Sequence, residues 1–97
     1  MYISKDLATW QTLLDFVERA SHEGKLSETL TLLLTPDERD TLSLRLQIIT
    51  KLLEKNASQR EIQQELKTSV ATITRGSNMI KSMPPEFLEW VRETLRK

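Results

Sequence analysis

The segment from Pro36 to about Leu53 constrains the fold of this chain more than any other, because it has the pattern of a helix that is apolar on two sides. Apolar residues at helical spacing form two rows, one of Leu42, Leu46, Ile49 and Leu53 and the other of Leu44, Ile48 and Leu52. A helix with two apolar sides must be covered on both. In a chain of 97 residues the second cover is most easily a second copy of the protein. The sequence therefore predicts that this helix lies at the centre of a homodimer.

Start and stop signals divide the remainder of the chain into further helices. Thr35-Pro36-Asp37-Glu38 combines a capping hydroxyl, a proline whose missing N–H costs nothing there, and a glutamate that completes a capping box. Ser58-Gln59-Arg60-Glu61 repeats the box, and Gly24 is placed to end the first helix. Helices are expected over about 5–21, 26–33, 36–53, 58–66, 69–81 and 85–95. The predicted fold class is all-α: a single domain of residues 1–97, with a dimer body of about 1–57 and 83–97.

Composition excludes several classes of protein. The chain has no cysteine, which removes disulfide bonds, zinc knuckles and thiol catalysis together. It has no apolar run near the ~18 residues of a membrane span and no apolar core of a secretory signal in residues 1–10. We therefore expect a cytoplasmic protein with no membrane partner. The acidic cluster of Asp37, Glu38 and Asp40 lies at a helix start, where a favourable interaction with the helix dipole explains it better than a metal or acid/base site. No arrangement of Ser, His and Asp, of Lys or of carboxylates indicates catalysis, so we expect a protein that is not an enzyme and that has no metal and no cofactor.

Residues 58–81 have the elements of a helix-turn-helix, because two short helices are separated by the three-residue break Lys67-Thr68-Ser69. The net charge of the chain is zero, but this segment carries a local excess of two positive charges. Gln59 and Arg60 begin the first helix, where a phosphate would meet free amides and the helix dipole. The second helix has small residues that suit a DNA groove, namely Ala71, Thr72 and Thr74. Its apolar underside consists of Val70, Ile73 and Ile80. An ordinary helical hairpin without DNA binding fits this spacing equally well.

Gly76 is a second unusual feature, because a glycine in mid-helix costs about 1 kcal/mol relative to alanine. Such a cost is reasonable where something approaches the backbone closely. With Arg75 beside it, and Thr72 and Met79 on the same side, the glycine could form a hollow for a small carboxylate with a flat apolar body. The alternative is that Gly76 only permits close packing of two helices.

Three runs of residues now identify a resemblance to the bacterial tryptophan repressor family: Leu-Thr-Pro-Asp-Glu-Arg at 34–39, Ser-Gln-Arg-Glu at 58–61 and Ala-Thr-Ile-Thr-Arg-Gly-Ser-Asn at 71–78. The resemblance covers nearly the whole chain and weakens before about Leu30. It implies an intertwined homodimer that binds L-tryptophan as corepressor and then a palindromic operator in double-stranded DNA, repressing genes of tryptophan biosynthesis or uptake.

The resemblance also implies a ligand pocket. The indole would lie between Arg45 and Arg75, whose planar guanidinium groups can stack on its two faces. Arg75 and the hydroxyl of Thr35 would hold the ligand carboxylate, while backbone carbonyls near Leu32 and Leu34 would take up the ammonium. Leu32, Leu34 and Thr35 would come from the partner subunit. Gly76 would leave room for the ring, and Met79 stands where well-known members of the family have a serine near the ammonium.

For DNA, the resemblance implies contacts from both motif helices. The expected residues are Gln59, Arg60, Gln63, Lys67, Ser69, Val70, Ala71, Thr72 and Thr74. Small residues at the tip of the second helix suit base contacts made through ordered water, as the family uses, better than long bidentate side chains. Gln63 replaces a lysine common in the family, and Lys67-Thr68-Ser69 replaces a more glycine-rich turn. We therefore expect an operator preference related to that of the family, with differences.

The two sites meet on one helix, which predicts how a ligand controls DNA binding. A ligand wedged between Arg45 and Arg75 would set the angle of the second motif helix, which is the one expected to enter the DNA groove. In a dimer this angle would set the distance between the two such helices, which must match major grooves about 34 Å apart. Two other functions remain open from the sequence. The chain could be a repressor of this fold that answers another effector, since Met79 departs from the family, or a structural helical dimer that binds no DNA.

Overall fold

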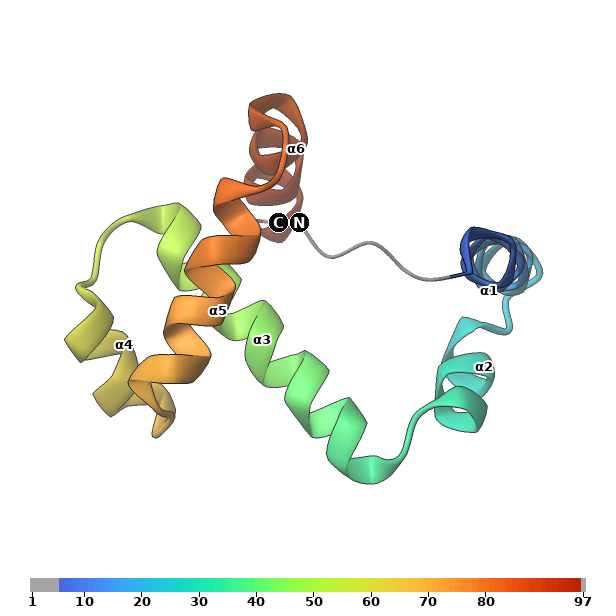
Figure 1. Cartoon of the computed structure of the whole chain (residues 1–97), viewed down its shortest axis with the longest axis horizontal. Helices are drawn as coiled ribbons and strands as arrows, with labels where there is room; N and C mark the ends of the chain where they lie inside the picture. The colour runs from blue at the N-terminus through green and yellow to red at the C-terminus, as the bar shows by residue number, and fades with distance from the viewer. Residues whose placement is uncertain (1–5, 97) are drawn as a thin grey trace. The chain divides into compact units, whose positions relative to one another are not determined.

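The computed structural model describes residues 6–96, and it is helical throughout, without a strand in that range. The helices follow in the order α1 (Leu7–His22), α2 (Leu26–Leu33), α3 (Pro36–Glu54), α4 (Gln59–Leu66), α5 (Val70–Lys81) and α6 (Pro85–Leu95) (Figure 1). The all-α fold class is confirmed, and the expected helix limits agree with these to within about two residues. The predicted start of the first helix at Lys5 lies outside the described residues.

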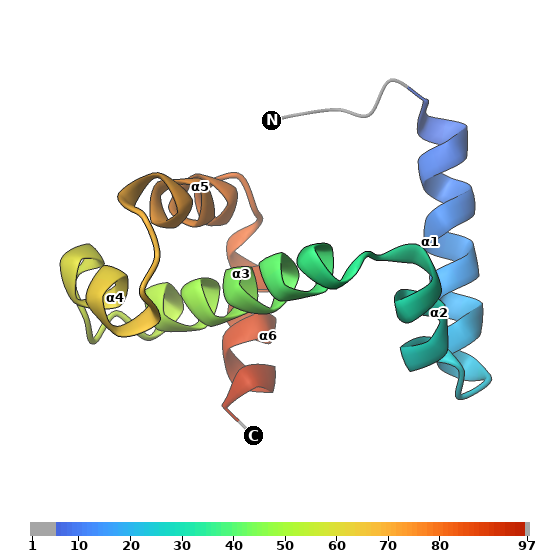
Figure 2. The ribbon, with the colours of Figure 1, turned by 90° about the horizontal axis from the view of Figure 1, so that it is seen from below.

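The chain forms two compact units that divide between Arg39 and Asp40, inside α3. In the first unit α1 and α2 pack as a hairpin (Figure 2). Gly24 turns the chain with a φ of 72°, as predicted for a glycine that ends a helix, and the Lys25 amide donates to the Ala20 carbonyl at 2.7 Å. Much of the apolar surface of α1 stays exposed, since Trp10 is 49% exposed and Phe16 is 48% exposed. This hairpin therefore buries few of its own apolar side chains.

The second unit is built around one isoleucine from each of three helices. Ile48 of α3, Ile62 of α4 and Ile73 of α5 are at most 1% exposed. Around them pack Leu44, Leu52, Ala57 and Leu66. Figures 1 and 2 show α5 and α4 beside the later half of α3. The row Leu44-Ile48-Leu52, one of the two apolar rows predicted for the central helix, is therefore the one that α4 and α5 cover.

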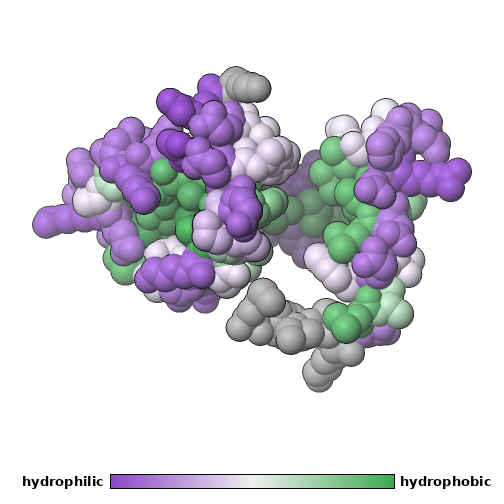
Figure 3. Space-filling model, turned by 90° about the horizontal axis from the view of Figure 1, so that it is seen from above, coloured by the Kyte–Doolittle hydropathy of each residue, from purple (hydrophilic) through white to green (hydrophobic). Residues whose placement is uncertain are grey.

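The other row of α3 remains largely uncovered within this unit. Leu42 is 45% exposed and Leu46 is 48% exposed, while Ile49 and Leu53 are half-buried. Apolar side chains accordingly reach the surface in Figure 3. An apolar row of this length needs a further packing partner to be shielded from solvent. The homodimer that would supply it stays a prediction.

Hydrogen bonds show why these helices begin where they do. At α3 the Glu38 amide donates to Thr35 Oγ1 at 3.1 Å, and the Thr35 amide donates to Glu38 Oε1 at 2.8 Å. Ser58 and Glu61 make the same reciprocal pair at the start of α4. Because the Glu61 carboxylate accepts a hydrogen bond from the Ser58 amide, the pKa of Glu61 lies below the usual value of a glutamate. Both predicted capping boxes are confirmed.

Candidate DNA interface and ligand hollow

The turn between α4 and α5 holds the two motif helices together. It consists of Lys67, Thr68 and Ser69, the break expected from the sequence. Ser69 Oγ accepts from the Thr72 amide at 3.1 Å and so caps α5. Lys67 adopts the left-handed conformation, with φ 54° and ψ 48°, and the Thr68 amide then donates to the Gln63 carbonyl at 3.2 Å. A lysine is thus held where glycine is usually preferred.

Charge is segregated around α4. Ile62 is buried and Leu66 half-buried on the side toward the core. At three- and four-residue spacing, the flank on one side of them carries Gln59, Arg60, Gln63 and Lys67, and the opposite flank carries Glu61 and Glu65. Glu65 contacts Lys51 of α3. The polar and basic flank is therefore free of carboxylates, as a phosphate-facing surface requires.

Charge is also divided unequally along the chain, which the zero total conceals. Residues 40–97 carry ten basic side chains and seven acidic ones, whereas residues 1–39 carry four and seven. The excess of basic groups thus belongs to the unit that contains α4 and α5. Phosphate binding depends on such a local excess rather than on the net charge of the chain.

The first turns of α5 present small exposed side chains. Ser69, Ala71 and Thr74 are exposed and Thr72 is half-buried. Ile73 is fully buried and Ile80 half-buried, as expected for the underside of this helix. Val70 is 54% exposed, so its expected place on the apolar underside is wrong. The reason is that the first turn of α5 lies about 4.5 Å along the axis from Ile73, beyond the core that covers that residue.

An apolar hollow lies in the same unit, between α3, α5 and α6. Its volume is about 580 Å³, within the range of sites for small organic molecules. The polar groups at its wall are Arg45, Arg75 and Asn78, and the apolar ones are Leu46, Ile49, Met79, Ile80, Met83, Phe87, Leu88 and Val91. The structure thus brings together three of the predicted ligand residues, Arg45, Arg75 and Met79. Asn78 was not predicted, although it lies three residues after Arg75 and hence on the same side of α5.

The two arginines of the hollow have no acidic partner among the described residues. The ion pairs found in residues 6–96 involve Arg19, Lys51, Arg92 and Arg96 as the cations. Arg45 and Arg75 are both exposed. Two unpaired guanidinium groups beside an apolar hollow can receive an anionic ligand that has a flat apolar body.

Gly76 does not belong to the wall of this hollow. It is buried, and a Cβ atom added to it would lie 3.0 Å from Ile48 Cγ2 and 3.8 Å from Leu52 Cδ1. The glycine therefore lets α5 approach α3 closely, which was the alternative left open by the sequence. Direct room for a ligand ring at Gly76 finds no support in this geometry.

The remaining predicted ligand residues, Leu32, Leu34 and Thr35, belong to the first unit. Leu32 is 78% exposed near the end of α2, and Leu34 follows in an extended conformation. The hydroxyl of Thr35 accepts the Glu38 amide as a cap. A hydroxyl that accepts one bond still has its proton to donate, so capping and ligand binding by Thr35 are compatible. The role expected of these three residues, in the pocket of a partner subunit, stays a prediction.

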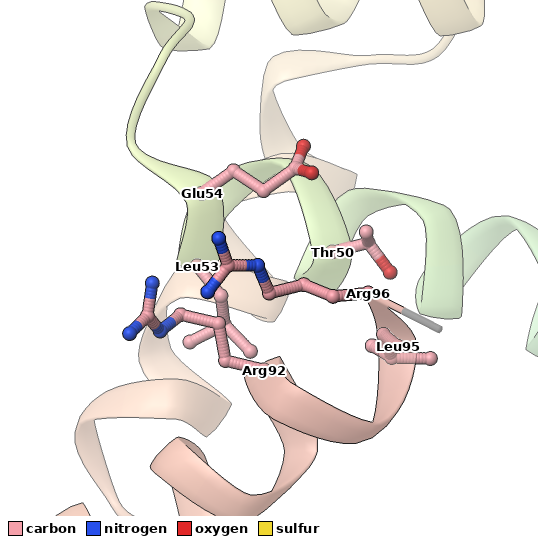
Figure 4. Close-up of a pocket in the computed structure, with 6 residues that line it drawn as sticks. All are labelled: Thr50, Leu53, Glu54, Arg92, Leu95 and Arg96. Atoms are coloured by element: carbon pink, nitrogen blue, oxygen red, sulfur yellow. The ribbon is translucent and has the colours of Figure 1, made fainter.

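A smaller hollow between α3 and α6 carries no comparable chemistry. Figure 4 shows it lined by Thr50, Leu53, Glu54, Arg92, Leu95 and Arg96. Its volume is about 10 Å³, room for one water at most. Arg92 pairs with Glu89 at 2.8 Å. No group of His, Cys, Asp and Glu within residues 6–96 could hold a metal ion, and no helix there is long and apolar enough to cross a membrane.

Lys67 offers a test of the turn and of the DNA interface together. Replacing Lys67 with glycine should raise the free energy of unfolding by about 1 kcal/mol, because the left-handed conformation strains a lysine backbone. The same change should weaken DNA binding and reduce the slope of log K against log salt by about 0.9, the loss of one phosphate contact. Urea unfolding and DNA titrations at several salt concentrations measure the two effects. An unchanged salt slope would remove Lys67 from the interface.

Comparison with known proteins gives a single consistent result. The family described as "Trp repressor protein" matches residues 8–95. A "Trp operon repressor homolog" of Pasteurella multocida is 60% identical over 95 residues, which cover 98% of this chain and 93% of the relative. Proteins of the same description from Histophilus somni and Actinobacillus succinogenes are 59% and 61% identical, covering 98% and 96% of this chain and 90% and 92% of the relatives.

Proposed function

This chain belongs to the Trp repressor protein family, and from that premise we propose that it is a transcriptional repressor of tryptophan operon genes. In this proposal it binds palindromic operator DNA as a homodimer, with L-tryptophan as corepressor. The observation that carries the proposal is the pairing of two sites on α5. Arg75 and Met79 line the apolar hollow, while Ser69, Val70, Ala71 and Thr74 are exposed at the start of the same helix.

L-Tryptophan matches the chemistry of the hollow. Its indole is flat and apolar, and its carboxylate needs a cation. The stacking of a guanidinium group on an aromatic ring contributes roughly 0.5–2 kcal/mol, and Arg45 and Arg75 each have an unpaired group at the wall. Met79 adds a polarisable thioether, which makes favourable contacts with aromatic rings. These groups support an aromatic amino acid as the ligand.

Operator DNA matches the exposed side of α4 and α5. Gln59, Arg60, Gln63 and Lys67 provide a carboxylate-free flank for the phosphate backbone. Ser69, Val70, Ala71, Thr72 and Thr74 form the first turns of α5, and their small size permits close approach to the floor of a major groove. All of these residues fall in the unit with the basic excess.

The two sites are coupled because they share a rigid element. A ligand between Arg45 of α3 and Arg75 of α5 fixes the angle between those helices, and with it the direction of the reading turns. In a symmetric dimer that angle also sets the distance between the two reading heads. Ligand binding then raises the affinity for DNA, and by linkage DNA raises the affinity for the ligand by the same factor.

A gel-shift titration tests this function directly. The protein is titrated onto a palindromic tryptophan operator and onto a scrambled duplex, each in the absence of L-tryptophan and in the presence of a saturating concentration of it. We expect a shift of the operator duplex that strengthens at least about tenfold with tryptophan, a coupling of about 1.4 kcal/mol. Equal shifts with and without tryptophan would indicate a different effector. Absence of a shift in every lane would indicate a structural dimer.

A further inference from the structure

One ion pair among the described residues joins two different helices. Lys51 Nζ of α3 contacts Glu65 Oε2 of α4 at 2.5 Å. The other ion pairs within residues 6–96 lie along α6 or at the end of α1. The pair lies at a hollow between α3 and α4 whose wall also includes Leu46, Gln47, Thr50, Glu54 and Leu66. It therefore links the central helix to the first helix of the motif.

The Lys51–Glu65 pair is partly shielded from solvent on one side. The side chain of Lys51 is 28% exposed, while that of Glu65 is 56% exposed. The hydrogen bond with Glu65 raises the pKa of Lys51 above its usual value. Glu54 also lies close enough to favour the charged lysine. Lys51 is thus favoured in its charged form beside Glu65.

The attachment of α4 explains why such a pair matters. This helix has eight residues, and two of them, Ile62 and Leu66, bury apolar side chains in the core. These two buried side chains lie one turn apart on the same face, so by themselves they leave α4 free to rotate about its long axis. A third contact on another face of α4 restricts this rotation. Glu65 is that contact, and it lies on the flank opposite to Arg60 and Lys67.

We propose that Lys51 is a positioning residue for DNA binding, which holds the acidic flank of α4 against α3 and thereby turns the flank of Gln59, Arg60 and Lys67 outward to the phosphates. This inference rests on the proposed function. It goes beyond that function by assigning a role to two residues outside the proposed ligand and DNA sites. It also explains why Glu65 is tolerated in a helix that faces a polyanion.

Charge substitutions separate positioning from simple electrostatics. Lys51→Gln removes a positive charge and Glu65→Gln removes a negative one, so long-range attraction to DNA would change in opposite directions. Loss of a positioning contact would instead lower the DNA affinity of both variants. We therefore expect each variant to bind operator roughly two- to five-fold more weakly than the wild type, the range of an exposed ion pair. The double variant Lys51→Glu with Glu65→Lys should return the affinity to within about twofold of the wild type.

Fluorescence anisotropy with an operator duplex at saturating L-tryptophan measures these affinities. Glu54→Gln is the matched control, since it removes a carboxylate near Lys51 and leaves the Lys51–Glu65 pair intact; it should not weaken binding. Amide hydrogen exchange in α4 is the second readout, and it should quicken in both single variants and recover in the double variant. Calorimetry should give the same tryptophan affinity throughout.

The outcomes distinguish this inference from the proposed function. Tighter binding by Glu65→Gln, with α4 exchange unchanged, would overturn positioning while leaving a tryptophan-dependent repressor intact. A wild-type chain that binds no operator would overturn both. Weaker binding by both single variants with recovery in the double variant supports the inference, whatever the operator sequence used.

Discussion

Replacement of Arg75 with alanine is expected to lower the affinity for L-tryptophan on the order of 100-fold. The change removes a charge-assisted hydrogen bond to the carboxylate, worth about 1.5–3 kcal/mol, and a stacking contact with the indole, worth roughly 0.5–2 kcal/mol. Because Arg75 makes no ion pair with another described residue, its loss should leave the fold intact. Isothermal titration calorimetry measures the affinity, and circular dichroism checks the fold.

Arg60→Ala is the matched control for this experiment. It deletes the same side chain from α4, on the flank away from the core. Tryptophan affinity should stay within about twofold, whereas operator affinity should fall and the salt slope should decrease by about 0.9. Arg75→Ala should weaken operator binding only when tryptophan is present. Equal tryptophan affinity in the wild type and in Arg75→Ala would refute the placement of the ligand between the two arginines.

The second large effect is expected at Gly76, where valine should lower the free energy of unfolding by about 3 kcal/mol. An added Cβ would already lie 3.0 Å from Ile48 Cγ2, and valine places two more methyl groups in the same space. Forcing extra carbon atoms into a packed core costs about 1–3 kcal/mol. The gain in helix propensity on replacing glycine is smaller, below about 1 kcal/mol. Urea unfolding measures the difference.

Gly76→Ala provides the graded form of that test, together with a compensating change in α3. Alanine should be less destabilising than valine, and it should lower tryptophan and operator affinity together because α5 must move away from α3. Ile48→Leu removes the Cγ2 methyl that the new Cβ meets, at a cost below about 1.5 kcal/mol by itself. The pair Gly76→Ala with Ile48→Leu should therefore be more stable than the sum of the two single changes predicts. Strict additivity would show that Ile48 does not limit the approach of the helices.

Local signals made the helices predictable. Helix ends are set by interactions between residues a few positions apart, as in the capping boxes at Thr35 and Ser58 and at the left-handed Gly24. Such interactions can therefore be predicted from the sequence. The same holds for the two apolar rows of α3, because helical spacing alone decides which side chains share a face. The family resemblance, in turn, rested on three uninterrupted runs and is confirmed by the comparisons.

Val70 shows where periodicity stops being informative. Its spacing from Ile73 places it on the underside of α5, but the side chain is 54% exposed. Spacing fixes the direction in which a side chain points and not the point at which the neighbouring helix ends. Asn78 was missed for a related reason, since only the packing of α5 beside α3 and α6 makes its face the wall of a hollow.

The segment of residues 36–53 predicted a helix with two apolar faces, and the sequence by itself determined that helix, its limits and its two apolar rows. Tertiary structure decided which face α4 and α5 cover, and it decided that Gly76 meets Ile48 rather than the hollow. It also paired Lys51 with Glu65, fourteen positions along the chain. Capping and periodicity act within a turn or two of helix, whereas packing and ion pairs depend on which helices meet, a choice made by the whole chain when its core closes.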